Sequence, residues 1–237
     1  MSGPERPSLP LTGRCWAAAE PVYTAICAHP FLRELADGTL PAMAFQYYVI
    51  QDAHYLAGYA QTLAALAARA PDPAATATFA GHAVGAIEVE RQLHPALLAG
   101  LGIDPGAVAG TPVSPTTLAY LSYLRATVAF GGWLEAAAAV LPCYWIYQRV
   151  GERLAATGSP NRQYQQWIDA YADPHFAVVV AEALTTVDRI AASHTGAGAD
   201  GAAVAAFCTT ARYEWMFWDA AYRLETWPPA EAPVAGG

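Results

Sequence analysis

The sequence has few basic residues, and they are spread along the chain. Of its 237 residues, 12 are Lys or Arg and 20 are Asp or Glu, which gives a formal net charge of −8. Nucleic-acid binding depends on clustered Lys and Arg, because these side chains displace the counterions of the phosphate backbone. The chain has no basic patch and no basic amphipathic helix, so neither nucleic acids nor anionic membranes are expected partners.

Signals for export, membrane insertion and disulfide formation are also missing. The first 13 residues, MSGPERPSLPLTG, contain three prolines and no apolar stretch of the kind found in a signal peptide. The longest uncharged apolar run, residues 136–147, is too short to cross a bilayer. The four cysteines show no CxxC spacing. These features favour a cytoplasmic protein with free thiols.

Strand patterns are nearly absent, whereas helical patterns bounded by Pro, Gly and capping residues follow one another along the chain. We expect helices at residues 13–26 (with a bend or break at Pro21), 42–70, 73–100, 115–130, 133–158, 161–171, 175–194 and 200–225, the last capped by Asp200. Residues 102–112 are rich in Gly and Pro and are expected to form a loop.

The predicted helices are very apolar, since 55% of the chain is hydrophobic, and they must bury their faces on one another. The sequence therefore predicts an all-α, single-domain helical bundle over residues 12–227. The flanks, residues 1–11 and 228–237, are rich in Pro, Ala and Gly and are expected to be loose.

The segment AVLPCYWIYQRVG, residues 139–151, places a proline and a cysteine inside an apolar helix. A lone cysteine there is more often a small core residue than a functional one. However, Pro142 cannot donate a backbone hydrogen bond and should open the helix locally. Tyr147 follows Cys143 by four residues and shares its face. A bend beside a thiol and a phenol could line a pocket, whereas Cys15, Cys27 and Cys208 lack such neighbours and are expected in the core.

Two carboxylates fall on apolar helix faces. Asp52 shares a helical face with the aromatic and aliphatic residues Phe45, Tyr48, Tyr55, Leu56 and Tyr59. A buried carboxylate is costly unless it is hydrogen-bonded or used, so a structural and a functional reading of Asp52 are equally open. Glu214 stands in YEWMFW beside several aromatic side chains. Such surroundings would raise its pKa and suit a general acid or base, although a helix-surface position remains the alternative.

Tyrosines and tryptophans recur at helical intervals elsewhere, at Tyr120, Tyr123, Tyr164, Trp167 and Tyr171. Taken singly, such residues are more often core than ligand contacts. Together with two inward acids, they would suit a planar, nitrogen-rich ligand. A competing metal site has little support: Glu88, Glu90 and His94 lie on one helix, but no second copy of the pattern appears, and the histidines at 54, 82, 175 and 194 are scattered.

Six motifs resemble those of the thiaminase II (TenA) family and come in that family's order. They are FLRELADGTLP at 31–41, QDAHYL at 51–56, SPTTLAY at 114–120, LPCYW at 141–145, WIDAY at 167–171 and YEWMFW at 213–218. The resemblance implies a haem-oxygenase-like helical bundle without haem, usually a homotetramer. It also implies hydrolysis of 4-amino-5-aminomethyl-2-methylpyrimidine to the 5-hydroxymethyl compound and ammonia, in thiamin salvage, with thiamin itself a further substrate.

The resemblance also implies roles for particular residues. Cys143 matches the position of the family's nucleophile, and Glu214 matches the position of its acid/base. Asp52 matches the carboxylate that binds the pyrimidine. The residues that fall on the lining of the pocket are Tyr55, Tyr120, Tyr147, Tyr171 and Phe217. His54 stands where relatives often carry tyrosine, which leaves the fine substrate preference open. No metal or organic cofactor is implied.

The implied mechanism is covalent. The thiol adds to an electron-poor ring carbon and helps to expel the amine, Asp52 holds the ring, and Glu214 protonates the amine and then activates water. Two other functions remain open at this point: a non-enzymatic regulator and a metal-dependent oxidase on the same fold.

Overall fold

The structure is a computed structural model that describes residues 9–193 and 198–228, with the backbone alone described for residues 89–96, 105 and 107. The described chain consists of helices and contains no strand. The helices are α1 (Leu11–Cys27), α2 (Pro30–Asp37), α3 (Ala42–Ala68), α4 (Pro73–Gly100), α5 (Pro105–Gly110), α6 (Pro115–Phe130), α7 (Trp133–Ala155), α8 (Arg162–Tyr171), α9 (Pro174–Ser193) and α10 (Ala199–Tyr222).

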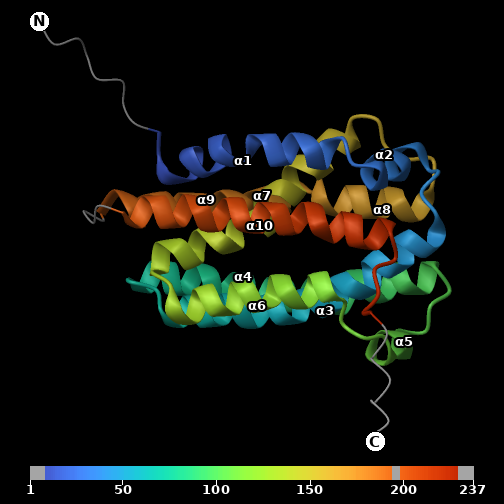
Figure 1. Cartoon of the computed structure of the whole chain (residues 1–237), viewed down its shortest axis with the longest axis horizontal. Coiled ribbons are helices and arrows are strands. Elements are labelled where there is room, and N and C mark those ends of the chain that lie inside the picture. Colours follow the sequence, from blue (N-terminus) through green and yellow to red (C-terminus); the bar gives the residue numbers. More distant parts are fainter. Residues whose placement is uncertain (1–8, 194–197, 229–237) are drawn as a thin grey trace, which may run out of the picture.

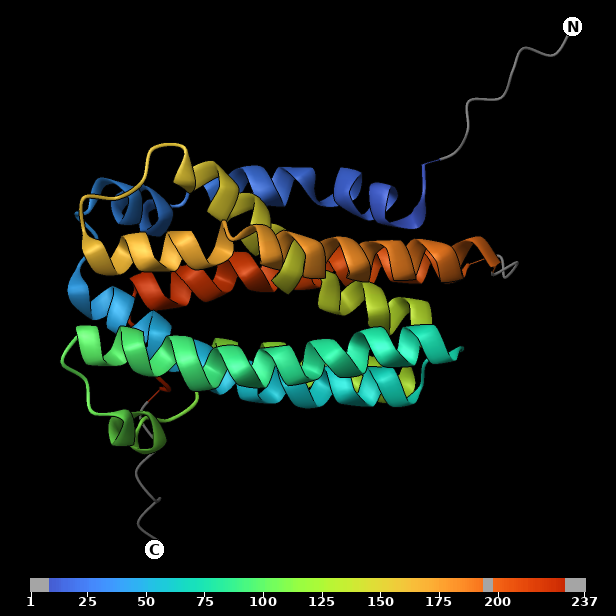
Figure 2. The same ribbon diagram turned by 180° about the vertical axis from the view of Figure 1, so that it is seen from behind.

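The long helices lie side by side in two groups. Figure 1 shows α1, α9 and α10 along one side of the molecule and α3, α4 and α6 along the other, with the short α5 outside the bundle. Helix α7 crosses obliquely from the α6 side to the α1 side (Figure 2). The most extensive contacts are those of α3 with α4, of α7 with α10, and of α1 with α10. Helices α3, α6, α7 and α10 also contact one another, which brings the middle of the chain against its C-terminal part.

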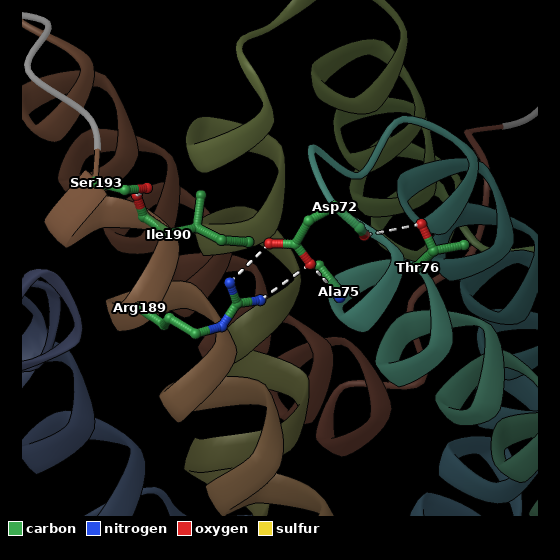
Figure 3. Close-up of polar contacts among 6 residues, drawn as sticks. All are labelled: Asp72, Ala75, Thr76, Arg189, Ile190 and Ser193. Carbon is green, nitrogen blue, oxygen red and sulfur yellow. Dashed lines mark hydrogen bonds and ion pairs between the residues drawn. The ribbon is translucent and has the colours of Figure 1, made fainter.

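Capping residues set the start of several helices, because the first backbone N–H groups of a helix lack partners within it. Asp72 accepts a hydrogen bond from the backbone N–H of Ala75 at 2.8 Å, and Pro73 follows it as the first residue of α4. The same carboxylate pairs with Arg189 of α9 at 2.6 Å (Figure 3). One side chain thus begins α4 and attaches it to α9.

Most of the predicted helix ranges are close to the observed ones. The predicted helix at 73–100 is α4, Ser114 caps α6 as expected, and α7 ends a few residues before the predicted position. Short α2 and α5 were not predicted, because neither is long enough to show a helical period; α5 lies within the expected loop at 102–112. The helix predicted at 175–194 corresponds to α9, and its last predicted residue, 194, lies outside the described residues.

Two details of the prediction are wrong. Pro21 does not break α1, which is helical from Leu11 to Cys27, and the alternative of a bend at this proline stays a prediction. Asp200 does not cap α10: the cap position is Gly198, whose φ of 111° suits glycine, and Asp200 lies in the first turn. Its carboxylate instead binds Arg14 of α1 at 2.7 Å.

Helix α7 remains continuous through Pro142. The predicted opening is therefore not a break in the helix. Close to the proline, the Val140 carbonyl accepts a hydrogen bond from the hydroxyl of Tyr59 on α3 at 2.8 Å. This contact ties the middle of α7 to α3, where the candidate residues of both helices lie.

Small residues allow α7 to approach its neighbours. The stretch Ala136–Ala139 is fully buried. Further along, a Cβ added at Gly151 would lie 2.5 Å from the carbonyl carbon of Tyr171. Only glycine fits so close an approach, which holds Tyr171 against α7. Among the described residues, no helix combines the length and apolarity that a membrane span needs.

Candidate active site

The carboxylate and the phenol that α3 contributes both face the interior of the bundle. Asp52 is 5% exposed and Tyr55 is 3% exposed, and the predicted companions on this face, Phe45, Tyr48 and Tyr59, are buried with them. Asp52 is therefore an inward carboxylate, as the helical spacing predicted. Asp52 also raises the pKa values of Cys143 and Tyr147 on α7, with burial as the largest cause for both groups.

Glu214 comes from α10 and is 1% exposed, so the surface alternative is wrong for this residue. The Tyr120 hydroxyl of α6 donates a hydrogen bond to its Oε1 at 2.6 Å. Burial, and to a smaller extent the nearby Asp52, raise the pKa of the Glu214 carboxyl from 4.5 to about 8, although hydrogen bonds from Tyr120 and Tyr147 act in the opposite direction. Glu214 therefore holds its proton at neutral pH and can act as an acid.

Cys143 lies on α7 and is only partly buried, in contrast to the fully buried Cys15. Burial, followed by the nearby Glu214, raises the pKa of the Cys143 thiol well above its usual range. Glu214 also raises the pKa of Tyr147, although burial has the larger effect on that phenol. Glu214 is thus close enough to Cys143 to influence the ionisation of the thiol, although 71 positions separate the two residues in the sequence. A thiol in this state needs a proton acceptor before it can attack.

Aromatic rings connect the candidate residues. Tyr55 lies 4.9 Å from Tyr120 and 5.7 Å from Phe217 between ring centroids. Tyr147 lies 4.8 Å from Tyr171 in the same measure. The structure therefore assembles all eight predicted residues around one interior region, from five helices: Asp52, Tyr55, Tyr120, Cys143, Tyr147, Tyr171, Glu214 and Phe217.

Four further side chains belong to the same region. The Tyr48 hydroxyl donates to the Tyr147 hydroxyl at 3.3 Å, and Tyr59 packs on Tyr55 at 5.5 Å between ring centroids. Both share the inward face of α3 with Asp52, so their helical spacing could have identified them. Trp167 and Trp218 contact Tyr147 from α8 and α10, and nothing in their spacing relates them to α3.

Among the described residues, three buried donors in this region make no hydrogen bond of ordinary geometry. They are the Tyr55 hydroxyl, the Trp167 indole N–H and the Trp218 indole N–H. A buried donor without a partner is costly, and a bound ligand or water that accepts from it removes that cost. The region therefore offers unused donors, a carboxylate and aromatic faces, which together suit a planar heterocycle.

His54 lies outside this region. Its Nε2 donates to the Thr111 carbonyl at 3.0 Å, and its side chain lines an outer groove between α3, α5 and α6. The sequence had left open an effect of His54 on substrate preference, and the structure gives it no direct route to such an effect. As for the metal alternative, Glu88 is exposed, while the side chains of Glu90 and His94 lie outside the described residues. Among the described residues, no group of three or more metal-ligating side chains occurs.

Comparison with known proteins decides the family. Residues 16–224 match the family described as TENA/THI-4/PQQC. The chain belongs to this family. The matched range contains every candidate residue of the site described above, and the predicted family membership is confirmed.

Relatives within the family have related names. The chain is 36% identical over 213 residues to the aminopyrimidine aminohydrolase of Bacillus subtilis strain 168, with 90% of each chain covered. It is 37% identical to the thiamine biosynthesis multifunctional protein ThiED of Corynebacterium efficiens, over 92% of this chain and 29% of that longer protein.

Solved structures share the fold of this chain. A TenA homologue protein from P. horikoshii OT3 superposes with a TM-score of 0.83 at 27% identity, over 91% of this chain and 99% of that one. A domain with a heme oxygenase-like fold from Shewanella denitrificans OS217 superposes with a TM-score of 0.70 at 17% identity, over 91% and 93%, which is a likeness of fold alone. The predicted all-α, haem-oxygenase-like bundle is confirmed.

Proposed function

We propose that this chain is an aminopyrimidine aminohydrolase of thiamin salvage. It converts 4-amino-5-aminomethyl-2-methylpyrimidine and water to 4-amino-5-hydroxymethyl-2-methylpyrimidine and ammonia, and it also cleaves thiamin. The similarity to the aminopyrimidine aminohydrolase of Bacillus subtilis supports the reaction, and the similarity to a thiamine biosynthesis protein supports the pathway. The observation that carries the proposal is the buried Glu214–Tyr120 pair beside the Cys143 thiol.

In the proposed reaction Asp52 binds the amino group and a ring nitrogen of the pyrimidine and makes the ring more electrophilic. The Cys143 thiolate adds to an electron-poor ring carbon. Glu214, which holds its proton because burial raises its pKa to about 8, donates that proton to the leaving amine. The C–N bond at the methylene carbon then breaks and ammonia leaves.

The second half of the reaction restores the enzyme. Glu214, now ionised, takes a proton from water, and the water oxygen bonds to the methylene carbon. The sulfur–carbon bond breaks and the ring becomes aromatic again. Tyr120 keeps its hydrogen bond to Glu214 in both states, while the aromatic side chains Tyr55, Tyr147, Tyr171 and Phe217 flank the ring.

One assay tests the function directly. The purified protein is incubated with the aminomethylpyrimidine, and ammonia and the hydroxymethyl product are measured, beside a parallel assay of thiamin cleavage. We expect one ammonia per hydroxymethylpyrimidine. Absence of turnover on both substrates would contradict the proposal.

We also propose that the functional unit is a single domain over residues 12–227 in a cytoplasmic homotetramer. Exposed apolar side chains on the outer face of α4, at Val84 and Ile87, support self-association, since they are 56% and 43% exposed in the single chain. Sedimentation of the purified protein measures the number of subunits.

A further inference from the structure

After α10 the chain turns sharply. The helix ends at Tyr222, and two residues later Leu224 adopts a φ of 53°, in the left-handed region that a non-glycine residue rarely enters. The Glu225 backbone N–H donates to the Ala220 carbonyl at 2.9 Å, which closes this turn over the end of α10. A backbone conformation of this kind persists where the surrounding structure holds it. The turn brings the Glu225 side chain to the beginning of α6.

The Glu225 carboxylate binds the first turn of α6. Its Oε2 accepts from the Thr116 backbone N–H at 2.9 Å, and its Oε1 accepts from the Thr116 hydroxyl at 3.0 Å. Thr116 is the second residue of α6, so its N–H has no partner within the helix. A carboxylate is favoured here, because it lies at the positive end of the helix dipole. Glu225 thus attaches the end of α10 to the start of α6 through two hydrogen bonds.

Helix α3 is joined to the same point. The Tyr47 hydroxyl donates to the Glu225 backbone carbonyl at 2.7 Å. One turn further along α3, the side-chain oxygen of Gln51 accepts from the backbone N–H of Ser114, the cap residue of α6, at 2.9 Å. The contacts of Glu225 with Thr116 and Tyr47 therefore form a clasp. It joins α3, α6 and α10, three helices that carry residues of the proposed site.

The clasp lies one helical turn from the partner of the proposed acid. Thr116 and Tyr120 are four residues apart and share a face of α6. Tyr120 is fully buried, and its hydroxyl donates to Glu214 at 2.6 Å. This hydrogen bond lowers the pKa of Glu214 against the larger effect of burial, because it stabilises the carboxylate. A movement of the first turn of α6 would therefore weaken the hydrogen bond to the acid.

We propose that Glu225 is a positioning residue, which holds the first turn of α6 so that the Tyr120 hydroxyl stays within hydrogen-bonding distance of Glu214. Glu225 acts through Thr116 and Tyr120 rather than on the substrate. Its effect on the reaction is that Glu214 gives its proton to the amine more readily, since Tyr120 stabilises the carboxylate that remains. The inference rests on the proposed role of Glu214 as the acid.

The test reads the Glu214 proton directly and does not need turnover. A protonated carboxyl has a C=O stretching band in the infrared, and the band of Glu214 is the one that Glu214→Gln removes. Its loss as the pH rises through about 8 measures the pKa of this group. The ionisable groups that face Glu214 among the described residues are Asp52 and Tyr55 of α3, Tyr120 of α6, and Cys143 and Tyr147 of α7, and the variants below change none of them.

Glu225→Ala removes both hydrogen bonds to Thr116. We expect the pKa of Glu214 to rise by about 0.5–1, because Tyr120 then stabilises the carboxylate less. Turnover should fall by about threefold to tenfold with KM close to normal, and the alkaline limb of the rate should move to higher pH. Glu225→Gln can accept from the Thr116 N–H and donate to its hydroxyl, so this variant should restore the wild-type values.

Asp188→Ala is the matched control. Asp188 of α9 accepts from the Thr12 backbone N–H at 2.9 Å and from the Thr12 hydroxyl at 2.6 Å. Thr12 is the second residue of α1, and α1 carries no residue of the proposed site. The control therefore loses the same pair of hydrogen bonds at the start of a different helix. It should lower the melting temperature about as much as Glu225→Ala and leave the pKa of Glu214 unchanged.

An unchanged pKa of Glu214 in Glu225→Ala would overturn the inference. An equal rise in Asp188→Ala would also overturn it, since this would indicate a general loosening of the bundle. Equal effects of Glu225→Ala and Glu225→Gln would do the same, because they would indicate the charge instead of the hydrogen bonds.

Thr116→Val decides the question where Glu225→Ala fails to fold. It removes only the hydroxyl contact and should raise the pKa of Glu214 by a smaller amount, and no rise would overturn the inference. A protein without aminohydrolase activity in which Glu225→Ala raises this pKa would retain the clasp and lose the proposed function.

Discussion

Cys143 and Cys208 are both partly buried free thiols on long helices, but Cys143 lies beside the Glu214 carboxyl. We expect Cys143→Ala to fold normally and to lose turnover by about 10³-fold or more, since loss of a covalent nucleophile has effects of this size. Cys208→Ala is the matched control, and it should keep full turnover with a packing defect of about 1 kcal/mol. Rates on the aminomethylpyrimidine and thermal melts of both variants check this. Near-normal turnover of Cys143→Ala would mean that Cys143 is a core residue without a catalytic role.

Glu214 is the candidate acid, and its pKa of about 8 predicts how the rate depends on pH. Turnover should fall as the pH rises through about 8, because the carboxyl then loses the proton that the amine needs. Glu214→Gln keeps shape and hydrogen bonding, so product affinity should stay close to normal while turnover falls by about 10²-fold or more. The alkaline limb should disappear from its pH profile. Cys143 also titrates, so the residual rate of Cys143→Ala must retain that limb if Glu214 is its source.

Asp52 is buried on the inward face of α3, where it is proposed to bind the pyrimidine. Asp52→Asn replaces an acceptor by a group that can present a donor to the ring. We expect affinity for the hydroxymethyl product to fall about tenfold to a hundredfold, the usual strength of a hydrogen bond to a charged group. Calorimetric titration measures it, with alkylation of Cys143 as the control for an intact thiol. Unchanged affinity would give Asp52 a structural role.

At the scale of the helices, the approach of α7 to the end of α8 controls one wall of the site. A Cβ at position 151 would lie 2.5 Å from the backbone of Tyr171, which cannot move without shifting α8. Gly151→Ala should lower the free energy of unfolding by about 1–3 kcal/mol through overpacking and should weaken product binding through Tyr171. Thermal melts and calorimetry check both effects.

Gly85→Ala is the matched control for this prediction. It lies inside α4, and a Cβ there meets no atom within 4 Å. It should leave binding unchanged and raise stability by roughly 0.5–1 kcal/mol, because alanine loses less backbone freedom than glycine when a helix forms. Equal behaviour of the two variants would mean that the contact between α7 and α8 is not tight.

Local sequence signals were sufficient for helices with a cap or a long apolar period. Pro73 after Asp72 and Pro115 after Ser114 marked the starts of α4 and α6, because proline fits the first helical turn and the preceding side chain accepts from it. The missed helices, α2 and α5, are eight and six residues long and span too few turns to show a repeated period, although α2 buries Phe31, Leu32 and Leu35. The break expected at Pro21 did not occur: α1 is helical on both sides of this proline and packs along α10.

At the scale of the whole molecule, the faces of single helices were predictable but the contacts between helices were not. Spacing alone indicated that Asp52 points inward, and the helical pattern around Glu214 suggested an acid among aromatic side chains. The hydrogen bond from Tyr120 to Glu214 joins residues 94 positions apart, and that of His82 with Glu182 joins residues 100 positions apart. No local period carries such a pairing, so these contacts could not be predicted before the fold was known.

Folding stability should also depend on Glu214. A carboxyl whose pKa rises from 4.5 to about 8 on folding binds more protons in the folded state than in the unfolded state throughout that interval. Its contribution to stability is therefore fully present below pH 4.5 and is lost as the pH rises towards 8, by roughly 1.4 kcal/mol per pH unit. Glu214→Gln has no such dependence. Denaturant melts of both proteins at pH 5, 6.5 and 8 should show the wild type losing stability relative to the variant as the pH rises. The same pH dependence of the free energy of unfolding in both proteins would contradict a raised pKa of the Glu214 carboxyl.

The candidate residues begin at Asp52 and end at Phe217, and α10, the last helix of the described part of the chain, supplies the proposed acid. A nascent chain on the ribosome therefore carries its thiol long before it carries Glu214. A fragment that ends between α7 and α10 contains Cys143. It lacks Glu214, the carboxyl to which Tyr120 donates a hydrogen bond. If Glu214 is the acid as proposed, turnover can appear only after α10 has been made, so measured activity counts molecules that contain α10 and ignores fragments that stop before it.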